Sequence, residues 1–148
     1  MPNPPRAATP PGWPRISSAL FYDDAAAAIE FLEKAFGFET RLKVEDGAGG
    51  IVHSELELDD GLVMVASSQD DDRRSPRSLG GANTQSLFVY VADVDAHYAR
   101  ARANGATLVT EPTVRDYGAD HWTDRTYEAL DCEGHRWWFA QRLRTPGS

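Results

Sequence analysis

The stretch ALFYDD, residues 19–24, decides the fold, because it returns later in the chain as FVYVAD, residues 88–93. Each copy is followed by a predicted helix and then by a glycine, Gly37 or Gly105. The offset is 69 residues at the final aspartate (93 minus 24) and 68 at the glycine (105 minus 37). A near-constant offset indicates a duplicated unit. Two facing copies enclose a cavity along their pseudo-symmetry axis, so we look for function between them.

The composition is that of an ordinary globular domain. The chain has 148 residues, of which 41% are hydrophobic and 26% are charged, and this length can bury one core. No apolar run approaches the roughly 18 residues that a membrane-spanning helix needs, and the start of the chain lacks the pattern of a secretory signal. The single Cys132 cannot form an internal disulfide. These features predict a cytoplasmic protein that has no membrane partner.

The net charge of −8 limits the partners that the surface can attract. Nucleic acids require a basic surface, so we expect no nucleic-acid partner. A negative surface is compatible with a cationic small molecule, although the charge can equally serve solubility alone.

Proline and turn residues divide the chain into five segments. A flexible arm at residues 1–14 contains six prolines, which favour an extended backbone. The first module is expected at 15–67 and the second at 85–142. The connector at 68–84 is rich in Ser, Asp, Arg and Gly and is predicted to be solvated. Residues 143–148 form a tail.

Both modules are predicted to have the order β-α-β-β-β, which is an α+β fold. Asp24 and Asp93 are expected to cap the two helices at their N-termini, and the first helix should run to about Phe36 before Gly37. Period-two patterns predict the strands, with a long loop at 115–124. The expected strands are 16–22, 38–44, 51–58 and 62–66 in the first module, and 86–91, 107–114, 126–130 and 135–141 in the second.

Alternation along the strands predicts which side chains face the helices and which face the cavity. We expect Val52, Leu56, Val63, Val65, Leu87, Val89, Trp137 and Phe139 to face the helices. On the opposite, concave side, aromatic faces and carboxylates together suit an aromatic or cationic ligand. The candidate ligand-binding residues are His53, Glu55, Phe88, Tyr90, Glu128 and Trp138, together with Trp122 on the long loop and Arg125 at its border. Tyr117 is a further candidate to close over a ligand.

Several motifs resemble the vicinal oxygen chelate superfamily, which includes glyoxalases, bleomycin-resistance proteins and dioxygenases. They are the paired modules, the helix end FLEKAFGF at 31–38, the step VADVD at 91–95 and the hairpin DCEGHRW at 131–137. The resemblance covers about residues 15–142. It implies two tandem modules that form a curved, cup-shaped mixed sheet with the helices outside.

The resemblance also implies where a metal would be held. Metal-using members bind a divalent ion through the first and last strands of each module, and those places correspond here to Ser17, Met64, Ser86 and Trp138. Hydroxyl, thioether and indole groups are poor ligands for a hard cation. We therefore expect no metal, no other cofactor and no metal-dependent catalysis.

A substitute site stays open as an alternative. His53, Glu55 and Glu57 lie on one strand face, and Glu128 comes from the other module, so they could hold a non-standard metal or act in acid–base chemistry. The same pattern also describes an ordinary half-exposed strand, or polar contacts to a ligand. Cys132 has no neighbouring His or Lys in sequence that would activate its thiol.

The sequence favours metal-independent binding of a small aromatic or cationic molecule, as in the sequestration of antibiotics by bleomycin-resistance proteins. The first alternative is a metal-dependent lyase, isomerase or dioxygenase with a non-standard site. The second is a partner-binding module whose cup is filled by its own side chains. The resemblance further implies a homodimer, in which the arm that ends at Trp13 and Pro14 could lie on the partner.

Overall fold

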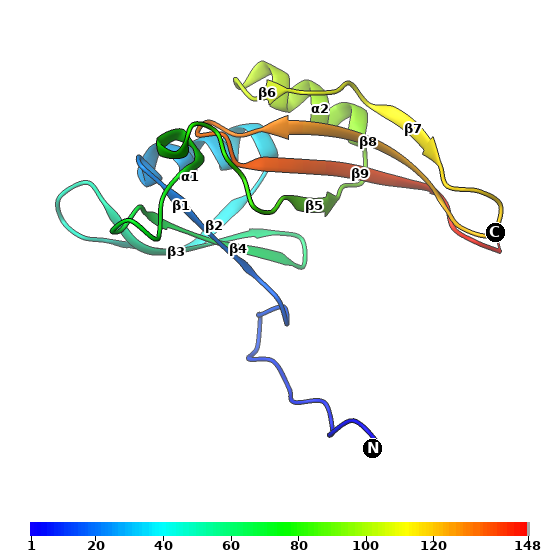
Figure 1. The fold of residues 1–148 in the computed structure, drawn as a ribbon, viewed down its shortest axis with the longest axis horizontal. Helices are drawn as coiled ribbons and strands as arrows, with labels where there is room; N and C mark the ends of the chain where they lie inside the picture. Colours follow the sequence, from blue (N-terminus) through cyan, green and yellow to red (C-terminus); the bar gives the residue numbers. More distant parts are fainter. Residues whose placement is uncertain (148) are drawn as a thin grey trace.

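The computed structural model describes residues 1–147 and contains two units of the same βαβββ design, joined by a short 3-10 helix, η2 (Pro76–Leu79) (Figure 1). The first unit comprises β1 (Ser18–Tyr22), α1 (Ala25–Phe31), η1 (Leu32–Phe36), β2 (Glu39–Glu45), β3 (Ile51–Leu58) and β4 (Gly61–Ser67). The second comprises β5 (Leu87–Tyr90), α2 (Val94–Ala103), β6 (Thr107–Leu108), β7 (Thr113–Asp116), β8 (Thr123–Leu130) and β9 (Arg136–Arg144).

The expected α+β fold is confirmed, and its strands form one sheet per unit. The first sheet has the order β1-β4-β3-β2, and the second has the order β5-β9-β8-β6, with β7 added beside β8. In both sheets the first strand pairs in parallel with the last strand of its unit. Strands β1 and β5 therefore end their sheets, and each leaves an unpaired edge.

The strand registers confirm that the two units correspond residue by residue at their centres. Met64 lies beside Ala19 on one side and Glu55 on the other. Trp138 occupies the same position in the second unit, beside Phe88 and Glu128. The last-strand positions inferred from the sequence, Met64 and Trp138, are thus equivalent in the structure.

The helices begin as the sequence predicts. The carboxylate of Asp24 accepts a hydrogen bond from the backbone N–H of Ala27, and Asp93 accepts from Ala96 in the same way. Gly37 ends the first helical segment with a φ of 84°, a left-handed conformation that glycine adopts without steric cost. The last turn before it, η1, is a wider π-helix.

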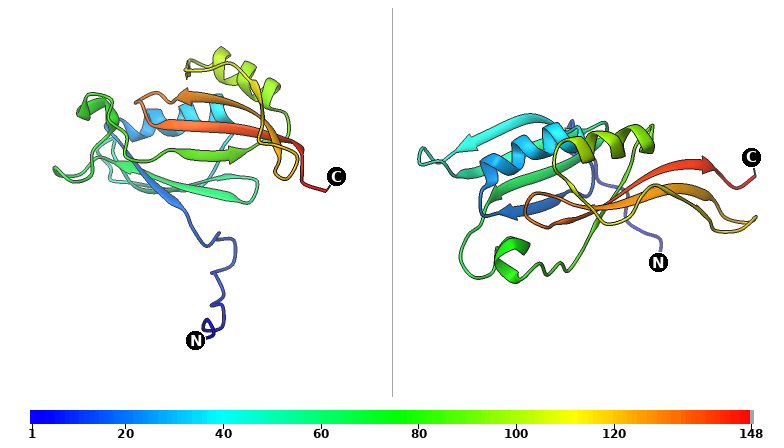
Figure 2. Two further views of the ribbon diagram at one scale, coloured as in Figure 1. Left: turned by 45° about the vertical axis from the view of Figure 1, so that its right-hand side comes forward. Right: turned by 90° about the horizontal axis from the view of Figure 1, so that it is seen from above.

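One hydrophobic core lies between the helices and both sheets. The side chains of Tyr22, Phe36, Trp137 and Phe139 are fully buried in it, as expected for those of Trp137 and Phe139. The helices lie on the same side of the sheets, and the N-terminal arm projects from the opposite side (Figures 1 and 2). Within residues 1–147, no helix is long and apolar enough to cross a membrane.

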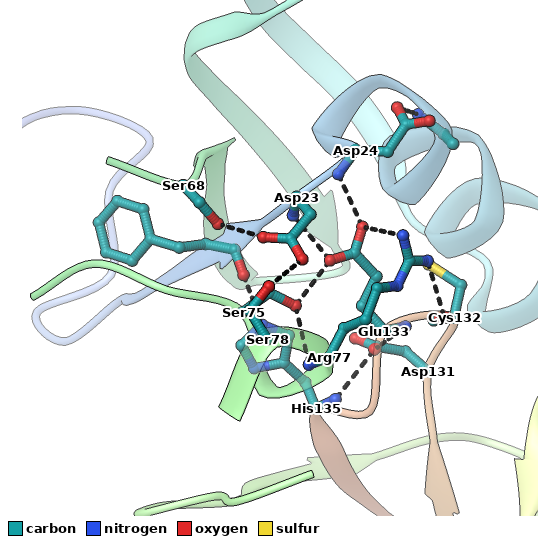
Figure 3. A network of polar contacts seen from close by, with 12 residues as sticks. Asp23, Asp24, Ser68, Ser75, Arg77, Ser78, Asp131, Cys132, Glu133 and His135 are labelled. Atoms are coloured by element: carbon teal, nitrogen blue, oxygen red, sulfur yellow. Dashed lines mark hydrogen bonds and ion pairs between the residues drawn. The ribbon is translucent and has the colours of Figure 1, made fainter. Parts of the chain in front are cut away.

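A buried carboxylate from the second unit joins it to the first (Figure 3). Glu133, on the turn between β8 and β9, accepts hydrogen bonds from the backbone N–H groups of Asp23 and Asp24 at 2.7 and 2.8 Å. It also accepts from the Ser75 hydroxyl at 2.6 Å and lies 3.7 Å from the Arg77 guanidinium. Its side chain is only 1% exposed. We call this set of contacts the Glu133 clasp.

The helices also bridge the two units. The Arg100 guanidinium of α2 donates to the carbonyl oxygens of Glu33 and Lys34 at the end of the first helix, both at 2.8 Å. His97 Nε2 lies 2.9 Å from the carbonyl of Phe36. The two units are therefore tied together at both the helix layer and the clasp.

Four local expectations were wrong. Val52 is 54% exposed, whereas its neighbour Ser54 is buried and donates to the carbonyl of Val65 at 2.6 Å, because a register shift between β2 and β3 interrupts the alternation. The connector is not simply solvated, since Ser75 and Pro76 are buried. The strand expected at 107–114 is split into two, and the long loop shortens to residues 117–122.

Candidate ligand-binding groove

A groove runs between the facing edges of β1 and β5. The two strands meet near their first residues, where the Gln85 side-chain amide donates to the Ser18 hydroxyl at 3.2 Å. One cavity lies where the strands meet, and one lies on either side of it. Together we call them the inter-unit groove. The middle cavity is its centre, the cavity beside the β3–β4 hairpin is its aromatic end, and the cavity beside the connector is its basic end.

The aromatic end is a cavity of about 440 Å³ between β5 and the β3–β4 hairpin. This volume lies within the range of small-molecule sites. Its lining is mainly apolar, and two exposed carboxylates, Asp59 and Asp60, also border it. The apolar lining includes Ile16, Leu58, Leu62, Phe88 and Tyr90.

Phe88 and Tyr90 present aromatic surface that the fold leaves uncovered. They are 54% and 49% exposed, and their rings meet edge to face with centroids 5.4 Å apart. Their neighbours Leu87 and Val89 pack against the core, so the alternation along β5 points the two rings away from the helices. The sequence prediction for this strand is confirmed.

Tyr90 is held in place by a charged pair on the same face. Its hydroxyl donates to Asp124 at 3.0 Å and accepts from Arg142 at 2.6 Å. Desolvation and the Asp124 carboxylate raise the pKa of Tyr90, which keeps the phenol neutral near pH 7. The Arg142 guanidinium also lies 5.2 Å from the ring centroid of Trp122, which links Trp122 to this face.

The basic end is a cavity of about 210 Å³ between β1, the connector and β9. Arg74, His135 and Arg136 line it, together with the polar side chains of Asn83 and Gln85. The centre, a cleft of about 360 Å³, contains Ser17 and Ser86. Within the described chain, the buried hydroxyl oxygen of Ser17 has no hydrogen-bond partner.

The two carboxylates expected to attract a cationic ligand are already neutralised. Glu55 accepts from His53 Nε2 and from Arg41 Nε, both at 2.8 Å. These hydrogen bonds, that of His53 above all, lower the pKa of Glu55. Glu128 forms an ion pair with Arg136. His53, Glu55 and Glu128 lie on the predicted strands, but the acidic groups in the described lining of the aromatic end are Asp59 and Asp60.

Arg125 does not lie near the groove, which corrects the sequence prediction. Its guanidinium makes a double hydrogen bond to Asp95 of α2, with distances of 2.9 to 3.2 Å. It therefore projects to the helix side of the sheet. Tyr117 packs against Trp122 at a ring distance of 5.6 Å, so it reaches the Tyr90 face only through that tryptophan.

Cys132 is not an activated thiol. Desolvation and the carboxylates of Asp131 and Glu133 raise its pKa to about 12, which suppresses the nucleophilic thiolate at neutral pH. This agrees with the absence of an activating neighbour in the sequence.

A family model described as Glyoxalase/Bleomycin resistance protein/Dioxygenase superfamily matches residues 15–139. The chain belongs to this superfamily. An uncharacterized protein of Mycobacterium bovis is 35% identical over 135 residues, which cover 88% of this chain and 85% of that protein. An uncharacterized protein of Mycobacterium tuberculosis is 35% identical as well, over 76% of its own length.

Solved structures are also similar to this chain. TioX from Micromonospora sp. ML1 shares 31% identity with a TM-score of 0.64, over 86% of this chain and 95% of that one. A glyoxalase/bleomycin resistance protein/dioxygenase from Alicyclobacillus acidocaldarius has a TM-score of 0.62 at 15% identity, over 86% and 90% of the two chains. The second similarity concerns the fold alone.

The positions that the family resemblance assigns to a metal ion carry side chains that do not fit a divalent cation. Met64 and Trp138 occupy the equivalent positions on β4 and β9, and Ser17 and Ser86 border the centre of the groove. Thioether, indole and neutral hydroxyl groups do not compensate a divalent ion for its lost water. Among residues 1–147, no three His, Cys, Asp or Glu side chains are grouped to hold a metal.

Sequence reasoning missed several residues that line the groove, notably Ile16, Asp59, Asp60 and Arg74. Ile16 begins the first predicted strand, and the two aspartates lie between the strands predicted at 51–58 and 62–66. Their position beside β5 depends on how the two units pack against each other. No signal local to these residues specifies that packing.

Proposed function

We propose that this protein binds a planar aromatic molecule, preferably a cationic one, at the aromatic end of the inter-unit groove, without a metal ion. The observation that carries this proposal is the pair of half-exposed rings, Phe88 and Tyr90, that line an apolar cavity of about 440 Å³. Large aromatic surfaces left uncovered in a cavity favour stacking with a flat ligand.

The preference for a cation rests on the charges that remain available. Asp59 and Asp60 line the cavity, whereas Glu55 and Glu128 are paired with arginines. Aromatic faces attract cations as well, through their quadrupole. The partnerless hydroxyl of Ser17 at the centre of the groove provides a further polar contact for a bound molecule, since buried polar groups are normally hydrogen-bonded.

Sequestration of a small molecule, with antibiotic resistance as its broad role, is the biological function that we propose for such a site. The superfamily includes bleomycin-resistance proteins by its own description. No donor set in the described chain favours the alternative of a metal-dependent lyase, isomerase or dioxygenase. Elemental analysis of the purified protein tests this directly, since about one tightly held Mn, Fe, Ni or Zn per chain would contradict metal-independent binding.

Fluorescence titration with two tricyclic probes tests the proposed ligand class. Proflavine is a planar cation, and anthracene-2-sulfonate is a planar anion of similar size. We expect proflavine to bind and the sulfonate to bind at least about tenfold more weakly, because the cavity has acidic but no basic side chains in its described lining.

The variant Phe88→Ala should weaken proflavine binding about tenfold, because it removes half of the stacking surface. Unfolding by urea should change little, since the side chain is half exposed. Tyr117→Ala is the matched control, because Tyr117 is as exposed as Tyr90 but does not line the cavity. Equal proflavine affinities in the two variants would remove the aromatic end from the proposal.

We also propose that the protein is a homodimer. In the structure the end of the arm lies on its own chain, where the Arg41 guanidinium lies 4.9 Å from the Trp13 ring centroid and donates to the carbonyl of Gly12 at 2.6 Å. Gel filtration of a chain that starts at Arg15 should therefore give the apparent mass of a dimer, as for the full chain. A change from dimer to monomer would show that the arm is part of the interface.

A further inference from the structure

We propose that the basic end of the groove binds a small oxyanion, a carboxylate or a phosphate group. The cavity combines two guanidinium groups, those of Arg74 and Arg136, with the imidazole of His135. Its described lining contains no carboxylate. Guanidinium groups bind oxyanions through paired, charge-assisted hydrogen bonds.

Hydrogen bonds within the protein fix several of the polar groups around this cavity. Arg74 donates to the carbonyl of Ser78 at 2.6 Å. The backbone N–H of Arg136 donates to the Asn83 side-chain oxygen at 3.2 Å, and the Asn83 amide donates to Gly134 at 2.8 Å. The connector is thereby anchored to the β8–β9 hairpin, so the polar groups are held in place before a ligand arrives.

The ion pair with Glu128 leaves N–H donors of the Arg136 guanidinium available for a ligand. Arginine has five N–H donors, and the structure records one of its terminal nitrogens, Nη1, on Glu128. The Arg136 side chain is 37% exposed. His135 Nε2 lies 2.8 Å from the carbonyl of Phe21, which accepts only, so this nitrogen carries a proton and the ring is oriented within the cavity.

The corresponding place in the other unit shows that this chemistry is specific to one end. By the strand registers, Arg136 corresponds to Leu62, which lines the aromatic end. Phe21, at the basic end, corresponds to Tyr90 by the 69-residue offset. The two ends therefore have corresponding strand walls, and of the two last strands only that of the second unit places a cation in the wall.

The size of the cavity limits what it can hold. About 210 Å³ accommodates a phosphate or carboxylate with a few attached carbon atoms, whereas the aromatic end has twice that volume. If the proposed function is correct, the natural ligand is thus a molecule whose aromatic, cationic part occupies the aromatic end and whose terminal oxyanion reaches along the groove to the basic end. The oxyanion site itself does not depend on that function.

Titration of the full-length protein with inorganic phosphate, and separately with acetate, tests the site. Backbone amide signals are followed by NMR at constant ionic strength, set with sodium chloride. We expect saturable shifts, for at least one of the two anions, concentrated at the amides of Thr84, Gln85 and His135. Saturation by phosphate alone or by acetate alone identifies which of the two groups the site takes, and either result supports it.

The variant Arg74→Gln should weaken that anion about tenfold, since it removes one charge-assisted partner. Ala82→Phe, which fills the cavity from the exposed connector, should weaken it similarly by exclusion. Arg102→Gln on the exposed side of α2 changes the net charge equally and should have no such effect.

Two results would overturn the oxyanion site. One is shifts that scatter over the surface without saturation for both anions. The other is equal weakening by Arg74→Gln and Arg102→Gln, which would reduce the effect to long-range charge. Neither result bears on proflavine binding, so a protein that binds proflavine but neither anion would keep the proposed function and lose this site.

Discussion

The strands that line the two ends of the inter-unit groove correspond to each other, yet the chemistry of the two ends is opposite. One end has exposed aromatic rings and two aspartates, and the other has arginines and a histidine under the connector. The strand registers match, since Phe88 and Ala19 occupy equivalent positions beside Trp138 and Met64. Equivalent strand positions thus carry different side chains at the two ends, and the connector covers only the basic end.

The second difference between the ends is mechanical. The β8–β9 hairpin beside the basic end carries the Glu133 clasp, which fixes the connector and the start of α1. The matching β3–β4 hairpin has only the exposed Asp59 and Asp60 at its turn. We therefore expect the basic end to be rigid and the aromatic end to be the more easily reshaped, because few buried contacts hold its hairpin.

Of the predicted changes, Glu133→Ala should have the largest effect on the free energy of unfolding. A small effect would contradict the proposed mechanical difference between the two hairpins. The change leaves two backbone N–H groups and the Ser75 hydroxyl without their buried acceptor. The free energy of unfolding should fall by about 3 kcal/mol, measured by urea denaturation. Asp60→Ala on the matching hairpin should change it by less than about 0.5 kcal/mol, and similar losses in the two variants would show that the hairpins are mechanically alike.

The double variant Asp59→Asn, Asp60→Asn should sharpen the comparison of charge. Proflavine affinity should fall about fivefold, since two nearby negative charges are lost at the aromatic end. Anion binding at the basic end should be unchanged, because these residues do not line that cavity. An unaltered proflavine affinity would mean that stacking alone selects the ligand.

The pH dependence of stability should show a smaller asymmetry, in the helix layer. His97 on α2 corresponds to Ala28 on α1 by the 69-residue offset. Phe36 offers only a carbonyl, so His97 Nε2 carries the proton and Nδ1 accepts from the Tyr127 hydroxyl at 2.5 Å. Burial is the main cause that lowers the pKa of His97 from 6.5, and Arg100 adds to the effect.

Because the folded-state pKa of His97 is depressed, the unfolded chain takes up a proton first as the pH falls. The contribution of His97 to stability is therefore complete above about pH 6.5 and declines below it, towards the lower folded-state pKa. Urea denaturation between pH 7.5 and 5 should show a smaller decline in His97→Gln than in the wild type. Parallel pH profiles for the two proteins would refute this role for the imidazole.

Much of the fold could be read from the sequence because the signals are local and occur twice. Asp24 and Asp93 cap their helices as predicted. The alternation along β5 correctly predicted that Phe88 and Tyr90 point away from the core. The prediction for Val52 failed because a bulge reverses the alternation that the sequence pattern assumes. Arg125 was misplaced because its partner, Asp95, is 30 residues away and comes close only through packing of α2 on β8.

The sequence by itself determined that the chain is a duplicated βαβββ unit, because residue identity and short-range periodicity occur twice. The family resemblance added the expectation that Ser, Met and Trp stand where related enzymes hold a metal. Only the tertiary structure decided which charges are available to a ligand. Arginines neutralise Glu55 and Glu128, whereas Asp59, Asp60 and Arg74 line cavities. The physical reason is that the Coulomb energy of a charge depends on its distance to other charges and on its exposure to water, and only packing sets both.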